Sequence, residues 1–243
     1  SDFEDLFTEM KGLPVIIRLL DPPLHEFLPH TENEIIALAQ SLNVTVEQLK
    51  NKIQSLKEFN PMMGHRGCRL DITYPEIAKM QARAIAEAII NVKHKHINVK
   101  PEIMIPLIGD IKELNFVKKL LIEEIEIVEK ENNIKIEYKI GTRIETPRAT
   151  IKADEIAKNA DFFSFGTNDL TQLTFGFSRD DSPKFLKDYY KNKILDQDPF
   201  TSIDEDGVWK LVDLASKFAR KTNPTIELGI CGEHGGDPKS IAF

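Results

Sequence analysis

Short strand-like runs alternate with longer amphipathic stretches along this chain. The strand-like runs lie at residues 13–20, 103–108, 135–148, 162–165 and 226–231. Between them, hydrophobic residues recur at helical spacing in the segments 77–92, 111–130 and 208–218. Apolar strands separated by amphipathic helices are typical of a parallel sheet covered by helices. The pattern therefore predicts an α/β fold.

Polar residues gather where the predicted strands end. They are Asp21, Glu145, Asn168, Asp169 and Glu233. A (β/α)8 TIM barrel carries its active site at this end of its strands. The chain holds about six strand–helix units, whereas a closed barrel needs eight. We therefore expect an incomplete (β/α)8 TIM barrel and a chain that is part of a longer polypeptide.

Three Thr-x-x-Glu/Gln pairs match the capping box that begins a helix. The pairs are Thr31 with Glu34, Thr45 with Gln48, and Thr73 with Glu76. The first two predict a helical hairpin over residues 31–59, which interrupts the strand–helix alternation. We interpret this hairpin as an insertion within a single barrel domain that spans residues 1–243. The third pair predicts the start of the next helix.

The segment 162–171 is the most informative stretch for function. An apolar run ends abruptly at Gly166, which lacks a Cβ and lets the backbone approach a ligand closely. The amides that follow can face an anion, and Asp169 can hold a hard cation. The alternative is that Asn168 and Asp169 serve only as the N-terminal cap of a helix.

Two arginines and two carboxylates extend this candidate site. Arg18 lies inside an apolar strand and Arg66 lies between two glycines, so both are candidates to bind an anion. Glu145 and Asp169 follow successive strands and could share one Mg²⁺ ion. The alternative for Arg18 is a structural salt bridge to a nearby acid. The alternative for Glu145 is an ion pair on the surface with Arg143 or Arg148.

The cysteines and the net charge narrow the class of protein. Cys231 ends the last strand and could exchange a proton, although it could also simply pack, and Cys68 is expected to be a small buried thiol. Two cysteines make no disulfide framework, so a reducing cytoplasm is expected. A net charge of -7 argues against a nucleic-acid or acidic-membrane partner. No signal peptide or membrane-spanning run is evident.

Four segments carry a resemblance to a known family. They are residues 18–26 (RLLDPPLHE), 60–70 (NPMMGHRGCRL), 166–172 (GTNDLTQ) and 229–238 (GICGEHGGDP). They resemble the PEP-utilising enzymes, in particular the phosphoenolpyruvate (PEP)-binding barrel of the pyruvate, phosphate dikinases, and the resemblance covers essentially the whole chain. The third segment is shared with PEP synthase and with enzyme I of the sugar phosphotransferase system. The first two favour the dikinase.

The resemblance implies roles for the charged residues. Arg18 would bind the substrate phosphate, with Arg66 beside it. Glu145 and Asp169 would hold Mg²⁺, which in turn would bind phosphoenolpyruvate or enolpyruvate. Phosphoryl transfer needs positioning and charge neutralisation, which these residues can supply.

The resemblance also implies roles for smaller side chains. Gly166, Thr167 and Asn168 would line the substrate together with Asp169. Cys231 would be the general acid that protonates the methylene carbon of enolpyruvate. The phosphoryl group would pass to a histidine on a separate domain, and none of the six histidines of this chain is expected to carry it.

The resemblance implies that this chain covers about barrel strands two to seven. The phosphohistidine and nucleotide-binding domains would lie elsewhere in a homodimeric parent protein, so this chain alone is expected to be inactive in the full reaction. Its open sheet edges are expected to pair between copies or to remain in a strained open barrel. Two other classes stay open: a Mg²⁺-dependent lyase that makes a pyruvate enolate, and a non-catalytic assembly domain.

Overall fold

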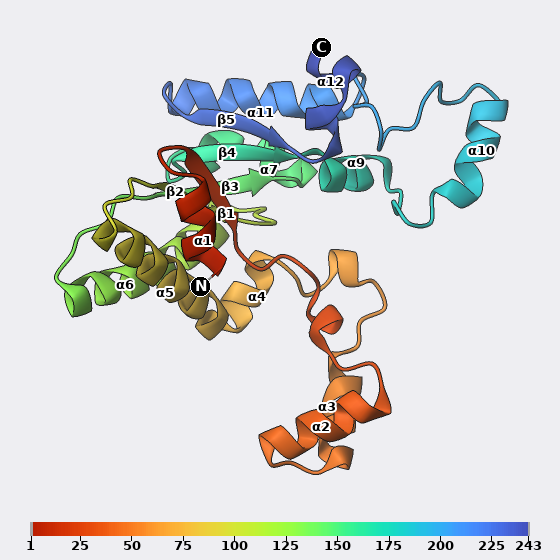
Figure 1. Cartoon of the computed structure of the whole chain (residues 1–243). Coiled ribbons are helices and arrows are strands. Elements are labelled where there is room, and N and C mark those ends of the chain that lie inside the picture. The colour runs from red at the N-terminus through yellow and green to blue at the C-terminus, as the bar shows by residue number, and fades with distance from the viewer. Residues whose placement is uncertain (1, 243) are drawn as a thin grey trace.

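One curled parallel sheet organises the molecule. The computed structural model describes residues 2–242. Its strands are β1 (Pro14–Arg18), β2 (Lys100–Ile105), β3 (Lys139–Ile144), β4 (Phe162–Gly166) and β5 (Glu227–Cys231). They lie in chain order, and each pairs in parallel with the next. Helices cover the outer side of the sheet (Figure 1). The α/β class is confirmed, and the curled sheet is a half-barrel, consistent with an incomplete TIM-like barrel.

The strands differ from the sequence prediction in number and in length. β3 spans Lys139–Ile144 and is shorter at both ends than the predicted segment 135–148, since α7 already begins at Pro147. Five strands occur within residues 2–242, one fewer than the approximately six expected. The long segment between β4 and β5 forms helices and loops and adds no strand. β2 ends at Ile105 instead of Ile108, because Pro106 has no amide hydrogen for the ladder and Leu107 is left-handed, with φ of 61°.

The helices fall into three groups by position. Those around the sheet are α1 (Asp2–Glu9), α4 (Cys68–Thr73), α5 (Pro75–His94), α6 (Ile111–Asn132), α7 (Pro147–Ile151), α8 (Ala153–Ile156), α11 (Val208–Thr222) and α12 (Pro238–Ala242). A separate pair is α2 (Glu32–Leu42) and α3 (Val46–Leu56). The segment between β4 and β5 holds α9 (Thr167–Phe175) and α10 (Pro183–Lys191). Within the described part of the chain, no helix is long and apolar enough to cross a membrane.

The hydrophobic core lies between the sheet and the outer helices. Ile103 of β2 and Phe163 of β4 are buried against residues such as Ile89 of α5 and Leu121 of α6. Burial of this apolar surface is the main favourable contribution to folding. The sheet is therefore held from its outer face, which leaves the inner face free to carry polar groups.

The sheet is open at both edges. In β1, Val15 and Ile17 are buried, whereas Ile16 points to the inner face and is 49% exposed. On β5, Ile230 lies in register with Phe165 on the outer face and is 43% exposed. In this single chain β1 and β5 each have one strand neighbour among the described residues, so the proposed pairing of edges between copies stays a prediction.

An ionic layer crosses the inner face at the N-terminal end of the strands. Lys139 Nζ of β3 lies 3.3 Å from a carboxylate oxygen of Glu102 and 2.5 Å from one of Glu227. These three residues begin or lie near the start of β3, β2 and β5. Because active sites of barrels lie at the opposite end, we assign this layer to sheet stability.

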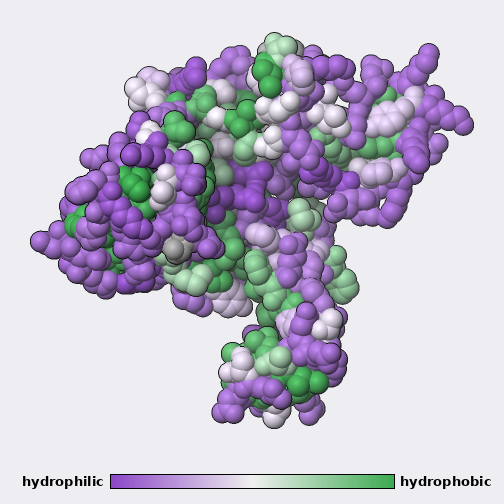
Figure 2. Space-filling model, viewed as in Figure 1, coloured by the Kyte–Doolittle hydropathy of each residue, from purple (hydrophilic) through white to green (hydrophobic). Residues whose placement is uncertain are grey.

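The helix pair α2–α3 forms as the sequence predicts over residues 31–59. Both capping boxes are present, with Glu34 N donating to the Thr31 hydroxyl and Gln48 N donating to the Thr45 hydroxyl. The pair has a small apolar core of its own and projects away from the sheet (Figure 1). Hydrophobic surface is visible where it joins the rest of the molecule (Figure 2).

The third predicted capping box is wrong. Thr73 is the last residue of α4, and its hydroxyl donates to the Arg69 carbonyl oxygen at 2.8 Å. Helix α5 begins at Pro75 after Tyr74, which makes no side-chain cap. The capping-box pattern was misleading here because Thr73 belongs to the end of the short helix α4, directly before α5 begins.

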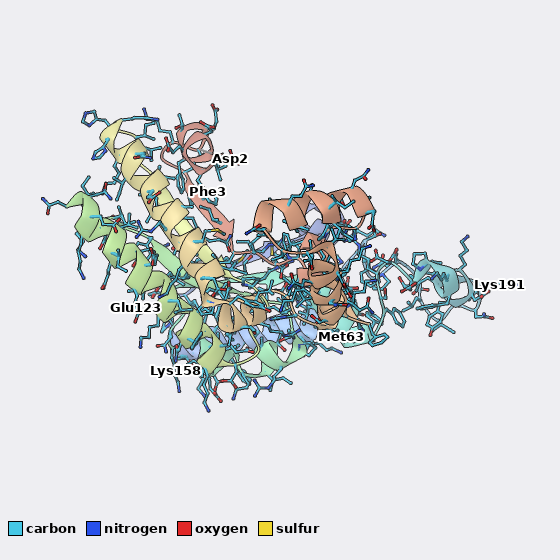
Figure 3. All side chains as sticks on the ribbon, turned by 90° about the horizontal axis from the view of Figure 1, so that it is seen from below. Asp2, Phe3, Met63, Glu123, Lys158 and Lys191 are labelled. Atoms are coloured by element: carbon cyan, nitrogen blue, oxygen red, sulfur yellow. The ribbon has the colours of Figure 1, made fainter. Side chains whose placement is uncertain are left out.

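The segment between β4 and β5 forms a second projection. Helix α10 lies away from the sheet, and Lys191 marks its outer end (Figures 1 and 3). Its base is an aromatic cluster in which Phe177 contacts Phe185 edge-on, with ring centres 5.0 Å apart, and Tyr189 at 5.9 Å. Such aromatic contacts give this projection local order.

Two isoleucines on α6 test whether the outer core dominates stability. Ile125 is 1% exposed and Ile127 is 42% exposed. We expect Ile125→Ala to lower the free energy of unfolding by about 2–5 kcal/mol, because it leaves a cavity in the core. Ile127→Ala should change it by less than about 1 kcal/mol. Urea denaturation of both variants checks this, and equal losses would contradict it.

Candidate functional site

The C-terminal ends of the strands bring the predicted charged residues together. Arg18 ends β1, Glu145 follows β3, and Asp169 lies in the first turn of α9, which directly follows β4. Arg66 comes from the loop between a 3₁₀ turn (Pro61–Met63) and α4. Three strand ends and one loop therefore contribute to a single charged cluster.

Asp21 lies at the centre of this cluster. Its Oδ2 atom is 3.0 Å from Arg18 Nη1, 2.9 Å from Arg66 Nη2 and 3.6 Å from Arg143 Nη1. The Asp21 residue is 4% exposed. The salt bridge considered as the alternative for Arg18 therefore exists, and it links Arg18 to the other arginines through one carboxylate.

Arg66 is fixed by several hydrogen bonds. Its guanidinium donates to Asp21 Oδ2 at 2.9 Å and to Asp169 Oδ1 at 3.0 Å, and also to the backbone carbonyls of Asp21 and Met62. Burial opposes its charge, but Asp169 and Asp21 raise the pKa of Arg66 above its ordinary value. Gly67 permits this loop position, because a Cβ there would lie 2.8 Å from Leu107 Cβ.

Glu145 is fully buried, and only one of its two carboxylate oxygens has a hydrogen-bond partner. Its Oε1 atom accepts a hydrogen bond from the amide of Leu107 at 2.7 Å. Oε2 has no hydrogen-bond partner, although Arg143 Nε lies 3.0 Å away out of alignment. Burial raises the pKa of Glu145, the nearby carboxylates of Asp169 and Asp21 add to the rise, and Arg143 opposes it.

Gly166 has a steric role beside Glu145. A Cβ at Gly166 would lie 2.4 Å from Arg143 Nε and 2.7 Å from Glu145 Oε2. Any side chain would therefore displace these charged groups. The close neighbours of Gly166 in this structure are side chains of the same chain, and the predicted approach to a ligand stays a prediction.

The capping alternative for Asn168 and Asp169 is wrong. Helix α9 begins at Thr167, and no side-chain cap precedes it. Asp169 instead accepts from Arg66, while Asn168 Oδ1 is buried without a hydrogen-bond partner. Both side chains are thus available for the site and are not needed to start the helix.

Cys231 and Thr167 lie beside the charged cluster. Cys231 ends β5 in register with Gly166, and its Sγ atom donates to the Phe165 carbonyl oxygen at 3.3 Å. The Thr167 hydroxyl lies 2.6 Å from His234 Nδ1. His234 Nε2 faces the Pro199 carbonyl at 2.9 Å and must donate to it, so a neutral His234 accepts the Thr167 proton. His234 therefore fixes the loop after β5 against the start of α9.

A cavity of about 300 Å³ opens beside the cluster. Its lining residues are Arg18, Met62, Arg143, Asn168, Asp169, Gln172, Arg179 and Asp180. Of the predicted site residues, Arg18, Asn168 and Asp169 line it. The other predicted site residues do not, although Arg66 contacts the lining residue Asp169 and Glu145 contacts the lining residue Arg143. The positive side chains in this lining suit a small anion.

The carboxylates fit a divalent cation in type. Glu145 and Asp169 both face Arg143, and Glu145 Oε2 is a buried oxygen without a hydrogen-bond partner. Two carboxylates completed by ligand oxygens and water are a typical Mg²⁺ environment. Across residues 2–242, no three histidine, cysteine or acidic side chains form a complete metal site by themselves. A cation here would need further ligands from a substrate or water.

Comparison with known proteins identifies the family. A family model described as the PEP-binding domain of PEP-utilising enzymes matches residues 1–243, the whole chain. The chain belongs to this family. It is 57% identical to the pyruvate, phosphate dikinase of Clostridium symbiosum and 55% identical to that of Rhizobium meliloti. It is 51% identical to the chloroplastic pyruvate, phosphate dikinase of Flaveria trinervia.

These alignments cover all of this chain but only a minor part of each relative. The covered shares of the three relatives are 28%, 27% and 26%. This PEP-binding domain therefore spans about a quarter of the length of the curated relatives it matches. The family resemblance noted in the sequence is confirmed.

Sequence reasoning did not predict the contacts of three residues of the site. Arg143 was considered only as a surface partner of Glu145, yet it is buried, and Arg148 pairs with Asp110 instead. Two-residue spacing on a strand places Arg143 and Glu145 on one face, a signal that could have indicated the contact. Asp21 was noted only as a polar residue at a strand end, and its contacts with the arginines could not be predicted, because Arg66 and Arg143 come from distant segments. His234 carried no signal for its contact with Thr167 for the same reason.

The loop that carries Arg66 continues into two buried titratable groups. Cys68 Sγ donates to the Leu107 carbonyl oxygen at 3.3 Å, and burial raises the pKa of its thiol, so it is the inert buried thiol expected. Asp71 is fully buried, and neither carboxylate oxygen has a hydrogen-bond partner. Burial raises the pKa of Asp71 to about 7.

Asp71 makes stability depend on pH. An unfolded aspartate titrates near pH ~4, so the folded state holds the proton to higher pH, and stability falls as pH rises from about 4 to about 7. We expect Asp71→Asn to match the wild type near pH 4 and to exceed it by roughly 2–4 kcal/mol above pH 7. Urea denaturation at pH 5 and pH 8, with the exposed Asp154→Asn as control, measures this. A gap that does not widen with pH would contradict it.

Proposed function

We propose that this domain binds phosphoenolpyruvate or pyruvate, together with Mg²⁺, at the C-terminal ends of its strands. Its role would be the pyruvate–phosphoenolpyruvate half-reaction of a pyruvate, phosphate dikinase. The observation that carries this proposal is the cluster in which Asp21, Glu145 and Asp169 contact arginines beside a cavity that suits an anion. The similarity to dikinases over the whole chain supports the choice of reaction.

The arginines would bind and orient the phosphate. Arg18 ends β1 and lines the cavity, and its side chain is 43% exposed, so it can turn to an incoming anion. Arg66 is held by Asp21 and Asp169 and would supply a fixed positive charge behind the substrate. Positioning and charge neutralisation account for most of the catalysis of phosphoryl transfer.

Glu145 and Asp169 would hold the Mg²⁺ ion. Bound there, Mg²⁺ would act as a Lewis acid for the enolate oxygen and the phosphate. Gly166 would keep the strand close enough to leave Glu145 in place, while Thr167 and Asn168 would line the substrate. Asn168 has a buried amide oxygen without a partner, which suits hydrogen bonding to a ligand or to water.

Cys231 would exchange a proton with the substrate carbon. It would protonate the methylene carbon when phosphoenolpyruvate is consumed and remove a methyl proton from pyruvate in the other direction. The phosphoryl group would move between the enolate oxygen and a phosphohistidine on another domain of the same parent chain. Overall, the parent would interconvert ATP, pyruvate and phosphate with AMP, phosphoenolpyruvate and diphosphate, as a cytoplasmic homodimer.

Ligand binding by this chain tests the metal assignment. We expect Mn²⁺, as a probe for Mg²⁺, to increase the affinity for oxalate, a planar enolate mimic. Glu145→Gln and Asp169→Asn should each weaken the Mn²⁺ affinity by about tenfold or more, because each removes a charged ligand. Calorimetry measures both affinities.

Glu123→Gln is the control for these variants. Glu123 lies on α6, far from the α10 projection (Figure 3), and its side chain is 48% exposed. This variant should bind like the wild type. Absence of metal-dependent oxalate binding in all proteins would refute the proposal and favour an assembly role.

Proton exchange tests the role of Cys231 and separates the dikinase from a lyase. In the longer protein that carries this domain, Cys231→Ala should slow exchange of the pyruvate methyl protons by about 10²–10⁴-fold. Oxalate binding should be retained, since the thiol contacts only the Phe165 carbonyl among the recorded hydrogen bonds of the described residues. NMR in D₂O measures the exchange. Unchanged exchange would favour a lyase, which does not require this thiol.

A further inference from the structure

Arg143 is the buried cation of this site that the proposed function leaves without a role. It lies on β3, two residues before Glu145, and is 6% exposed. Its Nε atom is 3.0 Å from Glu145 Oε2, and its Nη1 atom is 3.6 Å from Asp21 Oδ2 and 3.8 Å from Asp169 Oδ2. One guanidinium therefore faces three carboxylates, including both that would hold the divalent cation.

The contacts of Arg143 are electrostatic and poorly aligned. Its Nε atom has no hydrogen-bond partner, and the three carboxylates lie at distances of 3.0–3.8 Å. Arg66, by contrast, donates to two carboxylates and two backbone carbonyls. Arg66 is thus fixed in place, whereas Arg143 is held mainly by charge and can move when that charge is replaced.

A divalent cation and the Arg143 guanidinium cannot share this position. Mg²⁺ binds carboxylate oxygens at about 2.0–2.1 Å. A cation bound to Glu145 Oε2 and Asp169 would therefore lie where Arg143 now approaches the same oxygens, and the two positive charges would repel each other. Metal binding requires Arg143 to leave the carboxylates.

The cavity provides the place to which Arg143 can move. Arg143 already contributes to its lining, together with Arg18 and Arg179. A guanidinium released from Glu145 and Asp169 would lose its carboxylate partners and would need a new anion. An anionic ligand in the cavity is the nearest group that can supply one.

We propose that Arg143 is a resident cation that the divalent metal displaces and that then binds the anionic substrate. This inference rests on the proposed function and adds a residue to it. Arg143 lowers the affinity for metal alone and raises the affinity of the metal-loaded domain for the anion. The two ligands are thereby coupled through one side chain, and such coupling is reciprocal between the two binding equilibria.

The test compares Arg143→Met, which removes the charge but keeps an unbranched chain, with Arg143→Lys, which keeps the charge. We expect Arg143→Met to bind Mn²⁺ alone about tenfold more tightly than the wild type. With Mn²⁺ saturating, its affinity for oxalate should be about tenfold weaker. Arg143→Lys should stay within about threefold of the wild type in both measurements. Titration calorimetry gives all four affinities.

The opposite signs of the two changes separate this role from a structural one. Loss of local structure would weaken both affinities, and circular dichroism with thermal unfolding checks the fold of each variant. Arg148→Met is the matched control, because Arg148 pairs with Asp110 outside the cavity and should leave both affinities unchanged.

Failure of this inference differs from failure of the proposed function. If Glu145→Gln and Asp169→Asn weaken Mn²⁺ binding but Arg143→Met does not strengthen it, the displacement of Arg143 is refuted and the metal site stands. If neither the wild type nor Arg143→Met binds Mn²⁺, both are refuted. If Arg143→Met binds Mn²⁺ detectably and the wild type does not, the result supports displacement of Arg143 by the metal.

Discussion

Desolvation of charge at the C-terminal ends of the strands is the constraint on which the site depends. Asp21, Glu145, Arg66 and Arg143 are all less than 10% exposed. A buried charge without an opposite partner costs several kcal/mol, so each carboxylate requires a guanidinium close by. This requirement explains why the Arg66 loop is drawn against β1 and α9. It also explains why Gly166 must be small, since the charged groups pack directly on its backbone.

The fold positions the charged cluster, and the cluster contributes little to the stability of the fold. Buried ion pairs add little net stability, because their attraction is offset by the loss of hydration. The apolar core lies on the other face of the sheet, where α5, α6 and α11 pack against the strands. The inner face can therefore carry buried charged groups such as Glu145, which lower stability, because burial of apolar surface on the outer face stabilises the fold.

The sequence was sufficient for features that depend on local pattern. Hydrophobic periodicity predicted the parallel sheet and its helices, and two capping boxes correctly marked the starts of α2 and α3. It also placed Arg18, Glu145 and Asp169 near one end of the sheet. Features that depend on contacts between distant segments were missed, as Asp21 meeting Arg66 and Thr167 meeting His234 show. The boundary of β2 was missed because Leu107 adopts a left-handed backbone, which hydrophobic pattern does not encode.

The open edges of the sheet affect how strongly the charges of the cluster interact. Ile16 on the inner face of β1 and Ile230 on the outer face of β5 are apolar residues that this chain leaves exposed at the two edges. An element that covered these edges would remove apolar surface from water and would also exclude water from the cluster. Charge interactions strengthen as the effective dielectric constant falls. Closing the barrel wall would therefore increase both the attraction of the arginines for an anion and the repulsion between Arg143 and a metal ion. Displacement of Arg143 by the metal would then change the affinity for the anion more strongly in a closed barrel than in this half-barrel.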